Sequence, residues 1–569
     1  AGETLLNEAA VNDITGDKAI GNDITGNEAS ASKTVRSEAL ETETSLPNFR
    51  QGDAIILYER NRDTDNVTNK MVFKGNIEYL TENEISIRLR ATQQNPSVLP
   101  AESLYAIEHD TMDTTFRSMY QGLYIYLSAR KERRDLLLSQ RPPRFDESLD
   151  SMISRSEDDF TRIALKAKAA QDYFLLIGPP GTGKTSCALK KMVETFHADK
   201  DAQILLLSYT NRAVDEICKS LASIAPAVDF IRVGSELSCD EAYRGHLIEN
   251  ELSSCNRRSE VYERIRNCRI IVGTVAAISG KPELFRLKHF DVAIIDEATQ
   301  ILEPQLLGIL CARGEDGKDA IDKFVLIGDH KQLPAVVQQN TEQSAIYDES
   351  LLSIGLTNLK DSLFERLYRN CTATVHRSYD MLCRQGRMHP EVALFANRAF
   401  YGGRLIPVGL PHQIESSDTI CRLAFYPSVP EKAGASAKIN YSEARIVADL
   451  AARIYEDHQT DFDESRTLGI ITPYRSQIAL IKKEIESLGI PALNRILVDT
   501  VERFQGSERD VIIYSFCVNY PYQLKFLSNL TEEEGVLIDR KLNVALTRAR
   551  KQMLLTGVPT LLERNPLYK

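Results

Sequence analysis

The segment at 173–186, YFLLIGPPGTGKTS, constrains the fold of this chain more than any other stretch. Its first five residues are apolar or aromatic and predict a buried strand, and the residues after the glycines have the length and composition of a helix. Between them, Gly178 to Thr185 follow the pattern G-x-x-x-x-G-K-[ST]. In this pattern backbone N–H groups surround phosphate oxygens, the lysine reaches the β and γ phosphates, and the threonine hydroxyl is a ligand of Mg²⁺. The sequence therefore predicts an α/β protein that binds a nucleoside triphosphate.

Length and composition set outer limits on this prediction. The 569 residues allow roughly three to five domains. No apolar run reaches about 18 residues, so we expect no membrane span. The ten cysteines are scattered without a C-x-x-C pair, which predicts reduced thiols in a cytoplasmic protein. The net charge of −11 counts against a broad nucleic-acid surface but allows a local basic groove. The sequence does not begin with methionine, and whether it is a fragment of a longer protein stays open.

Changes in texture along the chain predict five segments. Residues 1–45 are polar, with the near-repeat NDITGDKA and NDITGNEA, and are expected to be disordered or a linker; a capped solenoid is the alternative. Short alternating runs over 46–113 predict a small β-barrel accessory domain, and 114–150 a helical stalk. Strands alternating with helices then predict two α/β domains in tandem, 151–379 and 380–569, of which only the first holds a phosphate loop.

The expected strands of the two α/β domains are short apolar runs. They lie at 173–177, 204–208, 270–274, 292–296 and 324–328 in the first domain, and at 468–472, 496–500, 511–515 and 553–557 in the second. The polar interval 230–265 is expected to be an inserted helical excursion. The charged run 130–135 is more typical of a solvated helix face than of a binding patch.

Polar residues at the ends of these strands are candidates for chemistry. Asp296 ends the run VAIID, where an acid at the carboxyl end of a strand can hold the metal, and Glu297 can deprotonate the attacking water. Gln332 follows the next strand and can contact the γ-phosphate. Arg387 and Arg548 can stabilise transition-state charge from a second domain. The alternatives are a helix cap for the acids, a plain turn for Gln332 and surface positions for the arginines.

Seven motifs in order resemble those of superfamily 1 helicases. They are GPPGTGKT, DEATQ, GDHKQLP, RQGRMHPEVALFANRAFYGG, ITPYRSQ, VDTVERFQGSERDVII and NVALTRARK. The resemblance covers roughly residues 155–560 and is strongest to the group that contains the nonsense-mediated-decay helicase and the Okazaki-fragment nuclease-helicase. It implies two tandem RecA-like domains of the P-loop NTPase class and a helicase or translocase that moves 5′ to 3′ by ATP hydrolysis with Mg²⁺.

The resemblance also implies roles for individual residues. Those implied to be catalytic are Lys184, Glu297, Gln332, Arg387 and Arg548; the metal ligands are Thr185 and Asp296. Those implied to bind the nucleotide are Gly178, Pro179, Gly181, Thr182, Gly183, Lys184, Thr185, Ser186, Gly506 and Glu508, the last contacting the ribose. Those implied to grip a single strand are Ser208, Thr210, Asn211, Thr274, Thr472, Pro473, Tyr474 and Thr500. Hydroxyls and amides suit phosphate oxygens better than bases, so binding without sequence preference is expected on DNA or RNA.

Two departures from the family pattern bear on nucleotide choice. The window 156–163 holds no glutamine to read adenine, and Gly386 replaces an aromatic residue of the family motif. ATP is the expected nucleotide, with relaxed use of other NTPs as the alternative.

Three expectations concern activity and partners. A clamp that binds nucleic acid under NTP control without unwinding it is the alternative function. Since no nuclease-type metal motif precedes residue 155, we expect no cleavage by this chain. We expect a monomer without membrane association, with protein partners reached through the N-terminal segment.

Overall fold

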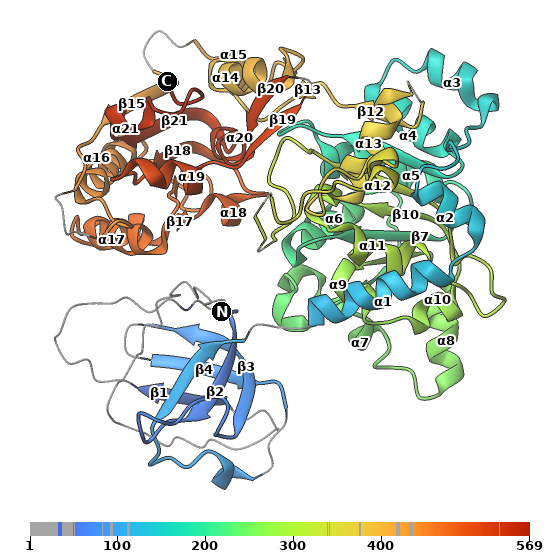
Figure 1. Ribbon diagram of the computed structural model, residues 1–569, viewed down its shortest axis with the longest axis horizontal. Helices are drawn as coiled ribbons and strands as arrows, with labels where there is room; N and C mark the ends of the chain where they lie inside the picture. Colours follow the sequence, from blue (N-terminus) through green and yellow to red (C-terminus); the bar gives the residue numbers. More distant parts are fainter. Residues whose placement is uncertain are drawn as a thin grey trace. The chain divides into compact units, whose positions relative to one another are not determined.

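The computed structural model describes most of the chain and separates it into two units. The described residues are 32–36, 49, 52–81, 84–91, 95–110, 114–337, 339–340, 342–374, 377–416, 421–431, 436–533 and 535–569. The first unit comprises 1–113 and the second 114–569 (Figure 1). Each unit is described by itself.

The first unit is an antiparallel sheet of five strands in the order β1-β4-β3-β2-β5. The strands are β1 (Ser32–Arg36), β2 (Ala54–Glu59), β3 (Val72–Leu80), β4 (Glu84–Leu89) and β5 (Tyr105–His109). Alternate apolar residues of β2, β3 and β4 pack on one another to form its small core. Strand β1 lies within the segment expected to be a linker, and it differs from that expectation because it pairs with β4; most of 1–45 lies outside the described residues. Among the described strands no pairing joins β1 to β5, so the sheet formed by these strands is open.

The second unit contains a seven-stranded sheet that is parallel throughout, in the order β12-β6-β11-β10-β7-β9-β8. Its strands are β6 (Tyr173–Ile177), β7 (Ile204–Ser208), β8 (Phe230–Val233), β9 (Ile270–Thr274), β10 (Phe290–Ile295), β11 (Ile321–Gly328) and β12 (Tyr379–Met381). Because parallel strands are joined by crossover helices, both faces of such a sheet are covered and its strands are apolar throughout. Every residue of β6, β7, β8 and β9 is buried accordingly.

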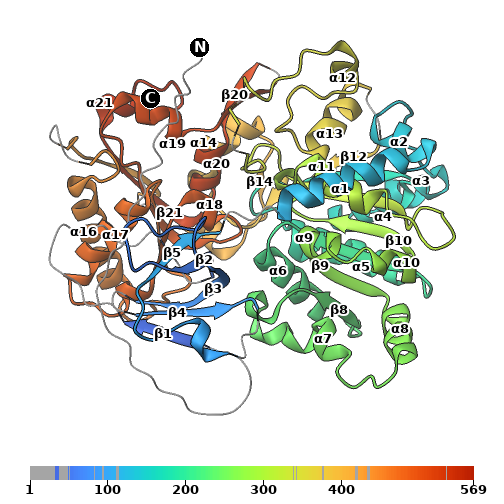
Figure 2. The ribbon, with the colours of Figure 1, turned by 60° about the horizontal axis from the view of Figure 1, so that its bottom comes forward.

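Two apolar cores lie on the two faces of this sheet. Along β6, Leu175 packs into one core and its neighbours Phe174 and Leu176 into the other, as the strand period of two requires. The helices that cover one face are α1 (Thr114–Ser128), α2 (Lys131–Leu137), α8 (Arg258–Asn267), α9 (Val275–Ser279), α10 (Glu283–Leu287), α11 (Glu303–Leu310) and α13 (Leu363–Ala373). Those on the other face are α4 (Asp159–Ala169), α5 (Lys190–His197) and α6 (Asn211–Ala222) (Figure 2).

A smaller parallel sheet of five strands follows in the order β15-β21-β18-β16-β17. The strands are β15 (Leu423–Pro427), β16 (Leu468–Ile471), β17 (Leu497–Asp499), β18 (Arg509–Ser515) and β21 (Ala549–Gly557). Helices α16 (Tyr441–Asp457) and α17 (Arg475–Glu486) cover one face. Helices α14 (Pro390–Tyr401), α18 (Val501–Phe504), α20 (Arg540–Leu546) and α21 (Pro559–Leu562) cover the other. The chain is thus an α/β protein with two parallel sheets.

Helix α1, which opens the predicted stalk, crosses α11 at unusually close range. A Cβ atom on Gly122 would lie 2.3 Å from the carbonyl oxygen of Pro304, and one on Gly308 would lie 3.1 Å from the Cα atom of Gly122. Glycine at both positions is what allows the two backbones to approach this closely. None of the described helices is long and apolar enough to cross a membrane.

Within the two parallel sheets the expected strands agree with the observed ones to within a few residues, and three observed strands of these sheets were not expected. Strand β8 lies inside 230–265, where a helical excursion was predicted; that prediction is wrong for these four residues, which form the edge of the first sheet, although α7 (Ile248–Glu251) and α8 follow. Strand β12 extends the first sheet past the expected boundary at 379. Strand β15 alternates exposed and half-buried residues at a sheet edge and so lacks the apolar run of a central strand.

One buried carboxyl group, on a helix that covers the second parallel sheet, makes the stability of the protein depend on pH. Glu443, in the first turn of α16, is fully buried, and its Oε2 accepts from the Ser515 hydroxyl at 2.7 Å and from the Cys517 N–H at 2.8 Å. Burial raises the pKa of Glu443 to about 7. Because the folded pKa lies above the unfolded one, this stabilisation is full below about pH 4.5 and is lost as the pH rises through 7.

Glu443→Gln is therefore expected to stabilise the protein at pH 8. The amide stays neutral, so the variant should gain up to about 3 kcal/mol over the ionised wild type, since each pKa unit is about 1.4 kcal/mol. Thermal melting at pH 4 and pH 8 measures this, and the difference should nearly vanish at pH 4, below the unfolded pKa of 4.5. Exposed Glu486→Gln on α17 is the matched control. A lower melting temperature for Glu443→Gln at pH 8 would show that the carboxylate is ionised and stabilising.

Candidate nucleotide site

The phosphate loop follows the buried strand β6 and leads into η3 (Lys184–Leu189), a π-helical turn that continues as α5. Gly181 and Gly183 have left-handed backbones, with φ of 73° and 76°, which glycine adopts without a steric cost. A Cβ atom on Gly178 would lie 2.0 Å from Cγ of Lys184, so only glycine leaves room for the lysine side chain to run back past the end of the strand. The loop is therefore shaped to hold the lysine and a phosphate group together.

The two predicted metal ligands meet beside this loop. Asp296 follows β10, is 1% exposed, and accepts a hydrogen bond from the Thr185 hydroxyl at 2.5 Å. Its other oxygen accepts from the backbone N–H of Glu297 at 2.8 Å, which fixes the carboxylate. Hydroxyl and carboxylate oxygens are the donors that a hard divalent cation prefers, so these two residues fit such an ion.

Glu297 has a strained backbone and a perturbed carboxyl group. Its φ of 53° is left-handed, which is uncommon for a residue with a side chain and tends to occur at functional sites. Burial, together with the charge of Asp296, raises the pKa of Glu297 to about 7. A carboxyl group of this kind can take up a proton at neutral pH, as a general base must.

Lys184 faces a set of acids. Burial lowers the pKa of its ammonium group, while the nearby carboxylates of Asp329, Asp296 and Glu297 oppose that shift. The positive charge on the lysine is therefore balanced by these carboxylates, and a phosphate group would compete for the same charge.

The C-terminal half contributes a buried arginine to this site. Arg548 is 2% exposed and donates to Oε1 of Gln332 at 3.1 Å, which joins the end of α20 to the loop after β11. Burial, with the neighbouring charge of Arg387, lowers the pKa of Arg548 to about 9, so the guanidinium group stays charged at pH 7. Gln332 is itself buried, and its amide donates to Asp329 at 2.7 Å.

Arg387 approaches the phosphate loop from the same half. Its Cβ would be 2.4 Å from a Cβ atom on Gly181, and the N–H of Gly386 donates to the carbonyl of Gly181 at 2.8 Å. Its guanidinium group donates to Glu508, the predicted ribose ligand, at 2.5 Å. The remaining predicted nucleotide ligands, Pro179, Thr182, Ser186 and Gly506, lie in or beside the same two loops. The structure thus brings together the residues predicted to be catalytic, although they are spread from 184 to 548.

Three residues of this site were not predicted. Asp329, Tyr401 and Asn543 are all buried and form a hydrogen-bonded chain beside Gln332 and Arg548. Each lies inside a motif quoted from the sequence, GDHKQLP, FANRAFYGG or NVALTRARK. Membership in a motif was the only signal that could have found them, because none occupies a position whose chemistry is evident from spacing.

The residues predicted to grip a nucleic-acid strand lie at the carboxyl ends of strands in both sheets. Ser208 ends β7 and is fully buried; its hydroxyl donates to the carbonyl of Asp296 at 3.3 Å, so it ties β7 to β10 and is not available to a ligand. Thr274 is buried and caps α9, and Thr472 is buried after β16. The remaining five, Thr210, Asn211, Pro473, Tyr474 and Thr500, are exposed or half-buried.

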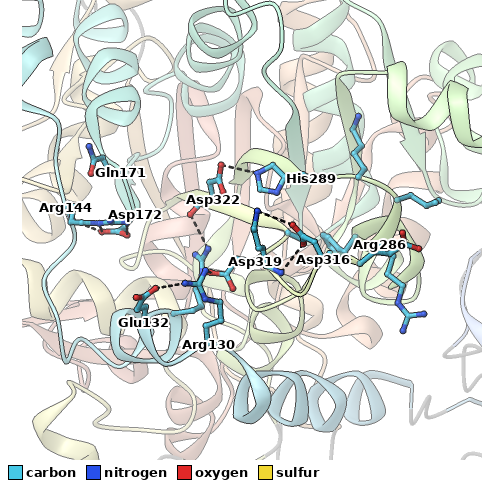
Figure 3. Close-up of a pocket in the computed structure, with 18 of the residues that line it drawn as sticks. Arg130, Glu132, Arg144, Gln171, Asp172, Arg286, His289, Asp316, Asp319 and Asp322 are labelled. Atoms are coloured by element: carbon cyan, nitrogen blue, oxygen red, sulfur yellow. Dashed lines mark hydrogen bonds and ion pairs between the residues drawn. The ribbon is translucent and has the colours of Figure 1, made fainter.

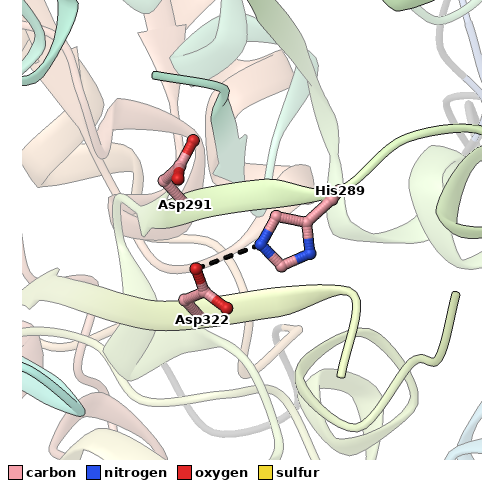
Figure 4. Close-up of side chains that lie close together, drawn as sticks. All are labelled: His289, Asp291 and Asp322. Atoms are coloured by element: carbon pink, nitrogen blue, oxygen red, sulfur yellow. Dashed lines mark ion pairs between the residues drawn. The ribbon is translucent and has the colours of Figure 1, made fainter. Parts of the chain in front are cut away.

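A separate pocket of about 780 Å³ lies near the amino ends of β6, β10 and β11, away from the phosphate loop at the carboxyl end of β6 (Figure 3). Asp172 there pairs with Arg141 at 2.8 Å and with Arg144 at 2.9 Å. Nearby, ligand atoms of His289, Asp291 and Asp322 lie within 4.8 Å of one another (Figure 4). Asp322 is 60% exposed and already pairs with His289 at 3.0 Å. This cluster is distinct from the metal ligands predicted from the sequence.

Family models and known proteins match most of this chain. A model described as an AAA domain matches residues 155–261 and 248–340, and a second with the same description matches 359–560. The chain is 28% identical over 575 residues to "DNA replication ATP-dependent helicase/nuclease JHS1" of Arabidopsis thaliana, covering 94% of this chain and 39% of that protein. It is 27% identical to "DNA replication ATP-dependent helicase/nuclease DNA2" of Bos taurus, covering 92% and 49%.

A third relative is shorter. "DNA polymerase alpha-associated DNA helicase A" of Saccharomyces cerevisiae is 24% identical over 536 residues, covering 80% of this chain and 73% of that protein. The chain therefore spans about half or less of the length of the two helicase/nuclease relatives, and most of the shorter one.

Proposed function

The chain belongs to the superfamily 1 helicases, in the group of the DNA-replication helicase/nucleases, and from this premise we propose that it is an ATP-driven motor that moves 5′ to 3′ on single-stranded nucleic acid. The observation that carries the proposal is the hydrogen bond from Arg548 to Gln332. This bond joins the residue before β21 of the second parallel sheet to the loop that follows β11 of the first. A hydrolysis site built from two sheets in this way couples NTP turnover to their relative movement.

In this proposal the two sheets are tandem RecA-like domains with ATP bound between them. Lys184 and the backbone of the phosphate loop bind the β and γ phosphates, and Glu508 contacts the ribose. Glu297 takes the proton of the attacking water, and Gln332 contacts the γ-phosphate. Arg548 and Arg387 neutralise the charge that develops on the transferred phosphoryl group.

Thr185 and Asp296 would hold the divalent ion, which we propose to be Mg²⁺. When bound, the ion would supply positive charge that offsets the negative charge of the nucleotide phosphates. The bond between the Thr185 hydroxyl and Asp296 already brings the two oxygens together. Both oxygens are therefore close enough to bind one ion.

The proposed track is single-stranded DNA. The names of the DNA-replication relatives favour DNA, and the residues at the strand ends favour contacts with a backbone rather than with bases. We also propose that the first unit is a small barrel-like accessory domain, that α1 and α2 form a helical stalk, and that the chain acts as a monomer.

The test is steady-state hydrolysis of each of the four NTPs, alone and with single-stranded DNA or RNA. Lys184→Ala, which lacks the phosphate-binding cation, is the blank and should show no turnover. We expect ATP to be preferred and DNA to stimulate hydrolysis. Hydrolysis that is indifferent to both polymers would contradict the proposed motor, and equal use of all four NTPs would confirm that the missing adenine-reading glutamine matters.

Strand displacement separates the motor from a clamp. On a forked duplex with a free 5′ single-stranded arm, the motor releases the displaced strand as ATP is consumed. A clamp would bind the fork in the presence of ATP and leave the duplex intact.

A further inference from the structure

Tyr401 is the last residue of α14, in the C-terminal half of the chain. Its hydroxyl nevertheless contacts the loop that follows β11 of the first parallel sheet. Its side chain is 1% exposed, and the hydroxyl donates to Oδ2 of Asp329 at 2.7 Å. Gly402 and Gly403, with φ of 59° and 74°, end the helix there. The tyrosine is therefore fixed at a helix end and reaches across to the other sheet.

Asp329 passes this contact on to Gln332. The carboxylate oxygen that accepts from Tyr401 also accepts from the Gln332 amide at 2.7 Å, and the other oxygen accepts from the Lys331 N–H at 3.1 Å. The amide nitrogen of Gln332 is thereby committed to Asp329. Its oxygen points the other way, where it accepts from Arg548 at 3.1 Å.

Asn543 closes the chain from the other side. Its amide donates to the Tyr401 hydroxyl at 2.8 Å and to the carbonyl of Lys331 at 2.7 Å, and it lies in α20, which ends two residues before Arg548. Burial and the charge of Asp329 hold the pKa of Tyr401 well above its usual value, so the hydroxyl keeps its proton and donates it to the carboxylate. One hydroxyl thus bonds both the loop that holds Gln332 and helix α20, which leads into Arg548.

We propose that Tyr401 is a positioning residue for NTP hydrolysis, which holds Gln332 and Arg548 in register when the two sheets come together. The inference rests on the proposed function, because it assigns Tyr401 a part in that reaction. The hydroxyl does not touch the phosphate loop, so its effect is on turnover rather than on binding of the nucleotide. Other ion pairs also join the regions of the two parallel sheets, including Lys331 to Glu533 at 3.2 Å and Arg540 to Glu365. Loss of one hydroxyl should therefore leave the fold and the approach of the sheets intact.

Tyr401→Phe removes only this hydroxyl and is the test. We expect kcat for DNA-stimulated ATP hydrolysis to fall about tenfold, since a misplacement of catalytic groups by about 1 Å can cost about 10²-fold. The KM for ATP should change less than about twofold, because the phosphate loop is untouched. Combined with Gln332→Ala, Tyr401→Phe should add little further loss, because both changes act through the same amide.

Tyr568→Phe is the matched control. Its hydroxyl also donates to a carboxylate, Asp539 at 2.6 Å, but both residues belong to the C-terminal half. The control should show a similar change in melting temperature and an unchanged kcat. Equal losses of kcat in the two variants, or an unchanged kcat in Tyr401→Phe, would overturn the inference while wild-type hydrolysis upholds the proposed function. Wild-type hydrolysis no faster than that of Lys184→Ala would overturn both.

Discussion

Replacing Arg548 by alanine is expected to reduce NTP hydrolysis by roughly 10³-fold or more, the effect of losing an arginine that stabilises the transferred phosphoryl group. The guanidinium group is buried, charged at pH 7 and hydrogen-bonded to Gln332. In a site with little water, such a charge stabilises the transition state far more than an exposed one would. Binding of ATP should fall much less, because the phosphate loop belongs to the other sheet. Single-turnover hydrolysis and nucleotide titration measure the two effects separately.

Because Arg548 is buried, its loss could also weaken the fold, and two further variants separate the effects. Arg548→Lys keeps a charge of similar reach but cannot donate in two directions, so we expect an intermediate loss of turnover with a near-normal melting temperature. Arg422→Ala removes another arginine that is 2% exposed in the same half, and it should lower stability without selective loss of hydrolysis. A loss below about tenfold in Arg548→Ala would mean that the stabilising charge comes from another residue, with Arg387 the first candidate.

Glu297→Gln should keep nucleotide binding and stall turnover. The amide is nearly isosteric and fits the left-handed position as well as the acid does, but it cannot accept a proton from water. Removal of a general base costs about 10²- to 10⁴-fold in rate. In the presence of ATP the variant is expected to stay on single-stranded DNA, since hydrolysis no longer resets the site. Filter binding and the rate of dissociation from labelled DNA measure this.

Glu315→Gln changes an exposed residue between α11 and β11 of the first parallel sheet. It is the control for loss of one negative charge. It should hydrolyse ATP and leave DNA as the wild type does. If Glu297→Gln hydrolysed ATP at a wild-type rate, Glu297 could not be the base. If it left DNA rapidly in ATP, release would not depend on hydrolysis.

Much of this architecture could be predicted because parallel strands are buried on both faces. The runs YFLLI and ILLLS have no polar residue before their last position, and they became β6 and β7 with unchanged bounds. The phosphate loop, Asp296 and Glu297 could be predicted because their spacing after a strand follows from the chemistry of phosphate and metal. In the same way, motif order pointed to Gln332 and Arg548, which lie in hydrogen-bond contact.

What the sequence did not predict depends on contacts between distant segments. Strand β15 is recognisable only from its pairing with β21, and β8 only from its pairing with β9. Ser208 has the residue type of a phosphate ligand, but its hydroxyl bonds the carbonyl of Asp296, a contact that no local pattern reveals. Tyr401 reads as one more apolar position on α14 until the loop that carries Asp329 is placed beside it.

The order of the strands has a consequence for the chain while it is being made on the ribosome. Strand β6 is synthesised about 200 residues before its edge partner β12, and Glu297 about 250 residues before Arg548. When the phosphate loop and Glu297 have left the ribosome, Arg548 has therefore not yet been synthesised. We expect such a chain to hold a nucleotide without consuming it, so that turnover begins only when both sheets are complete.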